Sequence, residues 1–125
     1  MDVTVYNGIT ERIIGCAIEV HRTLGSGLLE SIYEKALCSE FKQHGIRFEQ
    51  QVPVPVIYKG ENLGEMRLDL LVEDEVIVEL KAVDRVDPLF KAQLLSYLKL
   101  TKKKLGLLIN FNSAALKDGI TRVIL

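Results

Sequence analysis

The 125-residue sequence contains no tryptophan, and only 6% of its residues are aromatic. So few aromatic side chains leave little for a stacking platform of the kind that binds single-stranded nucleic acid. The 16 basic and 17 acidic residues give a net charge of −1, so the chain has no global positive field to attract nucleic acid. Any contact with nucleic acid therefore has to come from a local patch of the surface.

Long apolar segments and paired cysteines are lacking as well. No apolar run approaches the roughly 20 residues that a membrane-spanning helix needs, and the first ten residues show no signal-peptide pattern. We therefore expect no membrane association and a reducing, cytoplasmic location. Cys16 and Cys38 have neither CxxC nor metal-ligand spacing, and we expect both to be small buried residues on helices.

The composition that is present, 48% hydrophobic and 26% charged, is typical of a globular protein. Its length suits one domain, spanning 1–125. Apolar periodicity predicts a helix over 7–24, followed by a second helix that Ser26 or Gly27 caps and that runs to about His44. The apolar stripe of this second helix is expected to contain Leu29, Tyr33, Ala36, Leu37 and Phe41.

The rest of the chain predicts a sheet. Strand-like segments are expected at Phe48–Tyr58, where prolines indicate an edge or a bulge, and at Leu63–Glu73, Val76–Val83 and Leu105–Phe111. A helix that Asp87 caps and Pro88 opens is expected to end near Leu100. Residues 120–125 form either a last strand or a docked tail. The order α-α-β-β-β-α-β predicts an α/β fold with one sheet and helices packed on its faces.

The informative residues are charges within apolar strands. Glu79 and Lys81 share one face of the strand 76–83, and Asp69 shares a face with Leu71 in the preceding strand. Residues 66, 68, 70 and 72 are expected on the opposite face from Asp69. Burying a charged side chain in such a strand costs several kcal/mol unless the charge is paired or binds an ion. Two facing carboxylates would suit Mg²⁺ or Mn²⁺, whereas the structural alternative is an ion pair of Lys81 with one of them.

Further candidates are polar groups on the predicted helices. Glu30 lies on the apolar side of the second helix, where the alternative role is a capping box. Gln93 and Tyr97 are four residues apart and share a helix face; the alternative is a core tyrosine beside a surface glutamine. His21 falls within an apolar stripe and is expected to be a hydrogen-bonded core histidine rather than a catalyst.

Four short motifs together resemble a known family. They are GLLESIY at 27–33, QVPVP at 51–55, RLDL at 67–70 and ELKA at 79–82. The combination is similar to the GxxExxY proteins, a branch of the PD-(D/E)xK nuclease superfamily, and Gln93 with Tyr97 resembles the QxxxY element of RecB-like nucleases. The resemblance implies a restriction-endonuclease-like αβββαβ core with an extra N-terminal helix. Leu68 stands where the superfamily's name places proline, which affects local strand shape rather than metal chemistry.

The resemblance also implies roles for individual residues. The implied metal site uses Asp69, Glu79 and the Leu80 carbonyl with help from Glu30, and binds Mg²⁺ or Mn²⁺. Lys81 would be the catalytic lysine, and Gln93 and Tyr97 would help to place it and the DNA. The implied function is metal-dependent hydrolysis of DNA phosphodiester bonds. The alternative is a catalytically weak or inactive nuclease-fold module that acts in nucleic-acid binding or protein assembly, with a homo-oligomer or a partner protein supplying recognition.

Overall fold

The structure is a computed structural model that describes the backbone of residues 3–125 and the side chains of residues 7–125. Its elements are α1 (Val3–Leu24), α2 (Glu30–Gln43), β1 (Phe48–Tyr58), β2 (Glu61–Val72), β3 (Val76–Lys81), α3 (Pro88–Thr101), β4 (Leu105–Asn110), the 3₁₀ helix η1 (Leu116–Gly119) and β5 (Ile120–Ile124). The predicted α/β class and element order are confirmed, and the C-terminal segment forms a strand. Within this described part of the chain, no helix is long and apolar enough to cross a membrane.

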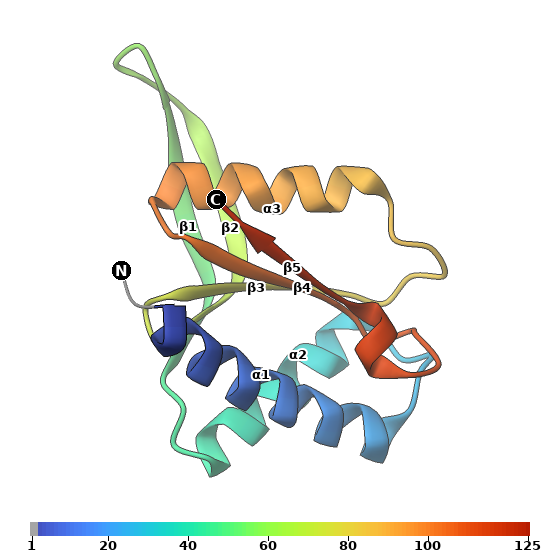
Figure 1. Cartoon of the computed structure of the whole chain (residues 1–125). Helices are drawn as coiled ribbons and strands as arrows, with labels where there is room; N and C mark the ends of the chain where they lie inside the picture. Colours follow the sequence, from blue (N-terminus) through green and yellow to red (C-terminus); the bar gives the residue numbers. More distant parts are fainter. Residues whose placement is uncertain (1–2) are drawn as a thin grey trace.

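The five strands form one mixed sheet in the order β1-β2-β3-β4-β5. Only β3 and β4 are parallel, and α3 connects them; the other neighbours are antiparallel. Helices α1 and α2 cover one face of the sheet and α3 covers the other (Figure 1). The architecture is consistent with the restriction-endonuclease-like fold, and it places β3 and β4 in the interior of the sheet.

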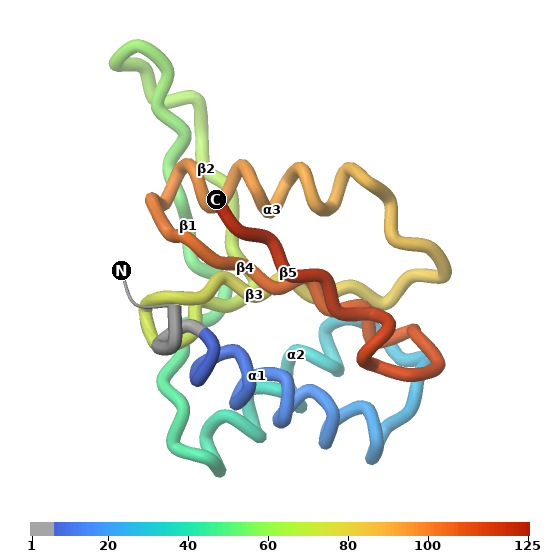
Figure 2. Tube along the Cα trace, in the orientation of Figure 1, coloured from blue at the N-terminus to red at the C-terminus, as the bar shows by residue number. Residues whose placement is uncertain are grey.

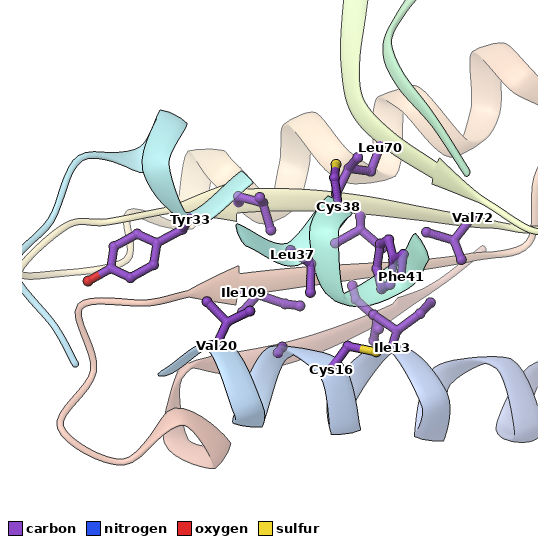
Figure 3. Packing of buried hydrophobic residues seen from close by; sticks show 14 of the residues in the cluster. Ile13, Cys16, Val20, Tyr33, Leu37, Cys38, Phe41, Leu70, Val72 and Ile109 are labelled. Carbon is purple, nitrogen blue, oxygen red and sulfur yellow. The ribbon is translucent and has the colours of Figure 1, made fainter. Parts of the chain in front are cut away.

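Two apolar clusters hold these layers together. The larger one packs α1 and α2 on the sheet, and Figure 3 shows Tyr33, Leu37 and Phe41 of α2 close to Ile13, Cys16 and Val20 of α1. The smaller one joins α3 to the other face through Leu94, Leu98, Ile77 and Leu108. Gly106 allows this helix to approach closely, because a Cβ there would lie 2.7 Å from the Leu94 side chain. As expected, Cys16 and Cys38 are buried, unpaired and helical.

The β1–β2 hairpin extends beyond the body of the protein. We call residues 55–67 the hairpin arm. None of its side chains is buried, and it projects past α3 in the orientation of Figures 1 and 2. Its base is irregular, because Gln51 has a φ of 50° and the register shifts between Pro55 and Ile57. The sequence predicts an edge or a bulge here; β1 is an edge strand, and its register is irregular as well.

This irregularity corrects one sequence prediction. Strict alternation places Leu68 with Leu70, but Leu68 packs in the α3-side cluster and Leu70 in the α1/α2-side cluster. Gln51 lies in β1 between the register pairs that involve these two leucines. A left-handed residue at that point interrupts the regular pleat, so the faces are no longer set by residue parity alone.

The start of α2 also differs from the prediction. The helix begins at Glu30 with Leu29 as N-cap, and no side chain caps it. The expected cap at Ser26 or Gly27 and the capping-box role for Glu30 are therefore wrong, and Leu29 is 73% exposed instead of belonging to the apolar stripe. Gly25 and Gly27 have φ values of 71° and 98°, a left-handed conformation that prevents the helix from starting earlier.

The start of α3 follows the prediction. The Asp87 carboxylate accepts a hydrogen bond from the Leu89 amide at 2.8 Å, and Pro88 occupies the first turn. This is a side-chain cap followed by a residue that needs no amide partner. The cap fixes the first turn of α3 beside the end of β3.

Candidate active site

Asp69 and Glu79 face each other where β2 and β3 separate. The regular backbone pairing of these strands ends at Leu70 and Val78. At the next position the Asp69 amide donates to Glu79 Oε1 at 3.0 Å, and the Leu80 amide donates to Asp69 Oδ2 at 2.9 Å. Carboxylate oxygens thus take the place of the backbone carbonyls that would accept these two amide hydrogen bonds in a regular antiparallel pair. Both carboxylates are therefore held at the point where β2 and β3 separate.

The electrostatics of this pair suit a cation. Glu79 is only 7% exposed, and burial, followed by the charge of Asp69, raises its pKa to about 9. Burial penalises the charged form, and a second carboxylate close by adds repulsion. A divalent ion would displace the proton that this raised pKa retains and would relieve the repulsion. Carboxylate oxygens are the hard donors that Mg²⁺ and Mn²⁺ prefer, so the two side chains fit a divalent ion.

Lys81 lies on the same strand two residues after Glu79, and its charge acts to lower the pKa of Glu79 but is the smallest of the contributions to it. The salt bridges among residues 7–125 join other partners: Arg22–Glu19, Arg47–Glu73 and Lys103–Asp74. The Lys81 ammonium instead lies 4.3 Å from the centre of the Phe90 ring on α3. The structural alternative raised by the sequence, an ion pair of Lys81 with Asp69 or Glu79, is therefore wrong for this structure.

Glu30 lies at the N-terminus of α2, within electrostatic range of Asp69 and Lys81. Partial burial and the charge of Asp69 raise its pKa, while the charge of Lys81 acts in the opposite direction. The structure therefore brings the predicted Glu30 near both residues. It does not complete a compact cluster, because within residues 7–125 no group of three or more His, Cys, Asp or Glu side chains is arranged to hold a metal.

The tyrosine of the GLLESIY segment fixes the loop that leads to Glu30. The Tyr33 hydroxyl donates to the Gly25 carbonyl at 2.6 Å and accepts from the Leu28 amide at 3.1 Å. Its ring stacks on Phe111, with centroids 4.6 Å apart. Tyr33 thus ties the α1–α2 loop to the end of β4 and determines where α2 begins.

Gln93 and Tyr97 are both half-buried on α3. Burial raises the pKa of Tyr97, and the charges of Glu79 and Asp69 add to the effect. This coupling places the tyrosine hydroxyl in the surroundings of the carboxylate pair. The i, i+4 spacing puts Gln93 on the same side of the helix, as the sequence predicts.

Two residues near Lys81 were not singled out from the sequence. Asn110 is 4% exposed; its side chain accepts from the Val83 amide at 3.1 Å and donates to the Val83 carbonyl at 2.9 Å. It therefore holds the chain just after Lys81. The other is Phe90, whose spacing of three residues from Gln93 is the only sequence signal that could have drawn attention to it.

His21 has the structural role that its position indicates. Its Nε2 atom lies 2.8 Å from the Ser113 carbonyl oxygen, so the ring donates a hydrogen bond there. This bond connects α1 to the loop after β4 and gives the imidazole a partner. The prediction of a hydrogen-bonded rather than catalytic histidine agrees with this contact.

Comparisons with known proteins agree with this geometry at the level of a superfamily. A family model described as the PD-(D/E)XK nuclease superfamily matches residues 7–123. No curated protein and no solved structure matches the chain. The matched range includes both strands that carry the carboxylates and the helix that faces them.

Proposed function

The chain belongs to the PD-(D/E)XK nuclease superfamily, and we propose that it is a metal-dependent nuclease that hydrolyses DNA phosphodiester bonds. We further place it in the GxxExxY branch, with Gln93 and Tyr97 as a QxxxY element. The observation that carries the proposal is the Asp69–Glu79 pair, in which Glu79 is buried and Asp69 half-buried. Each carboxylate accepts a hydrogen bond from a backbone amide of the facing strand, and neither forms a salt bridge among residues 7–125.

Asp69, Glu79 and the Leu80 carbonyl would hold the divalent ion, with Glu30 assisting from α2. When bound, Mg²⁺ or Mn²⁺ supplies charge neutralisation at the phosphate and a lowered pKa for a coordinated water. The hydrogen bonds from the Asp69 and Leu80 amides already hold one oxygen of each carboxylate in place before the metal binds. This reduces the reorganisation that metal binding requires.

The chain's own residues then have separable tasks. Lys81 would donate a hydrogen bond to the attacking water or to a phosphate oxygen, and its charge would stabilise the extra negative charge of the transition state. Gln93 and Tyr97 would orient the phosphate and the lysine from α3. The water oxygen would form a bond to phosphorus while one ester P–O bond breaks. The attacking water would give up one proton to bulk solvent, and the leaving oxygen would take one up from solvent.

A second candidate is a nuclease-fold module with little or no catalysis that acts in nucleic-acid binding or protein assembly. The net charge of −1 favours the protein-assembly form of this candidate, because a small near-neutral domain attracts DNA weakly by itself. Under either candidate, self-association or a partner protein is proposed to supply recognition. The two buried, unpaired cysteines suit the reducing cytoplasm that we propose for both.

The test is cleavage of fluorescent single- and double-stranded DNA oligonucleotides with Mg²⁺ or Mn²⁺. We expect cleavage by the wild type, loss of at least about 100-fold for Asp69→Ala and Lys81→Ala, and no change for Glu61→Ala, a matched exposed carboxylate on β2. Calorimetric titration with Mn²⁺ should show binding that Asp69→Ala removes. A wild type that cuts neither substrate with either ion would refute the nuclease proposal, as would full activity of Asp69→Ala.

A further inference from the structure

The Lys81 ammonium is held by an aromatic ring rather than by a carboxylate. Its Nζ atom lies 4.3 Å from the centroid of Phe90, within the range where the negative face of a ring attracts a cation. The side chain of Lys81 is half-buried. A lysine has four rotatable side-chain bonds, so without such a contact its ammonium would sample many positions.

The position of the ring is itself fixed. Phe90 lies in the first turn of α3, where its amide donates to the Asp87 carbonyl at 2.9 Å, and it packs against the α3-side apolar cluster. Phe90, Gln93 and Tyr97 follow the spacing i, i+3, i+7, which places them on one face of the helix. One helix face thus presents the ring and both predicted polar site residues.

We infer that Phe90 is a positioning residue for Lys81: its ring holds the ammonium beside the carboxylate pair while keeping it from forming an ion pair with either carboxylate. Asp69 and Glu79 then remain available to a cation, and the lysine is already oriented toward the site. This role rests on the proposed function of Lys81, but the contact itself can be tested without any cleavage.

The first test is NMR of the metal-free protein. Protons above the face of an aromatic ring are shielded, so we expect the Lys81 Hε resonances to lie upfield of those of the exposed lysines. Phe90→Leu should abolish this shift, Phe90→Tyr should preserve it, and Leu89→Ala should leave it unchanged, since Leu89 is a 58% exposed neighbour in the same turn. Unshifted Lys81 protons in the wild type would overturn the inference whether or not the protein is a nuclease.

The second test is cleavage of the DNA oligonucleotides with Mn²⁺. Phe90→Leu should lower kcat roughly 3- to 30-fold, the factor that corresponds to a cation–π contact, with KM for DNA and the calorimetric affinity for Mn²⁺ unchanged. Phe90→Tyr should restore kcat, which a purely packing role would not require. An unchanged kcat in a folded Phe90→Leu variant would refute the positioning role, whereas an inactive wild type with the expected NMR shift would refute only the nuclease proposal.

Discussion

Among the candidate site residues, Glu79 is the most deeply buried carboxyl, and the effect of its burial on the free energy of unfolding can be measured. Its pKa is raised from 4.5 to about 9 in the folded chain, so the folded protein holds a proton that the unfolded chain releases. Stability from this group is fully present below pH 4.5 and is lost as the pH rises from 4.5 toward 9.

We therefore predict that Glu79→Gln stabilises the metal-free protein. Glutamine mimics the protonated carboxyl and keeps an oxygen to accept from the Asp69 amide. The gain should be near zero below pH 4.5 and reach about 3.5 kcal/mol at pH 7, from about 1.4 kcal/mol for each pH unit above the unfolded pKa of 4.5. Urea unfolding in EDTA at several pH values measures it, with Glu61→Gln as an exposed control.

The same variant should lose Mn²⁺ binding in calorimetry, because an amide is a much weaker ligand than a carboxylate for a hard cation. A stability difference that does not change between pH 5 and pH 8 would contradict the buried-carboxyl interpretation. Greater stability with lost binding would indicate that this residue is kept for function.

Asn110 carries the second prediction at this scale. Its side chain satisfies both backbone groups of Val83 and accepts from the Asn112 amide. Asn110→Ala should lower the free energy of unfolding by about 2 to 4 kcal/mol, since it leaves partly buried backbone groups without partners. Denaturant unfolding measures the loss.

Asn112→Ala is the matched control for this experiment. It removes a hydrogen bond to Asp84 that is exposed to solvent, so we expect a change below about 0.5 kcal/mol. Equal effects of the two variants would contradict the assigned role of Asn110.

Among the elements, α2 depends on a contact that lies outside the helix. Tyr33→Phe removes both hydrogen bonds to the preceding loop but retains the stacking on Phe111. We predict a loss of about 1 to 2 kcal/mol in the free energy of unfolding and faster hydrogen exchange of the Leu28 amide, with Tyr58→Phe, an exposed tyrosine, as control. Unchanged exchange at Leu28 would show that the hydroxyl does not hold the loop.

The elements also show how far sequence patterns reach. The bounds of β1 and the Asp87–Pro88 start of α3 follow the prediction, because strand alternation and helix capping are local signals. The start of α2 does not, since it is set by two left-handed glycines and by a tyrosine bonded to a residue eight positions earlier. Such contacts leave no periodic trace in the sequence.

In the candidate site, too, some residues could be predicted from the sequence and others could not. Asp69, Glu79 and Lys81 stand out as charges within apolar strands. In the structure the Glu79 carboxylate accepts from the Asp69 amide, and the Asp69 carboxylate accepts from the Leu80 amide. Phe90 and Asn110 are an ordinary apolar residue and the last residue of a buried strand, so their sequence context is unremarkable. Their importance arises from which element they meet, which sequence patterns do not determine.

At the scale of the whole molecule, the hairpin arm is separate from both apolar clusters. We predict that replacing residues 56–64 with Asn-Gly, a favourable two-residue turn, changes the free energy of unfolding by less than about 1 kcal/mol. The reason is that none of the side chains of the arm is buried. Urea unfolding and Mn²⁺ calorimetry of the shortened protein check this; a loss of cooperativity would show that the arm supports the core.

The hairpin arm offers a position for labelling or immobilising the protein. Its tip, at Lys59 and Gly60, is a tight turn at the end of the hairpin arm, which extends beyond the other three strands of the sheet (Figure 2). A dye or a flexible tether attached there would report on the molecule, or immobilise it on a sensor, without touching the layers on which folding depends.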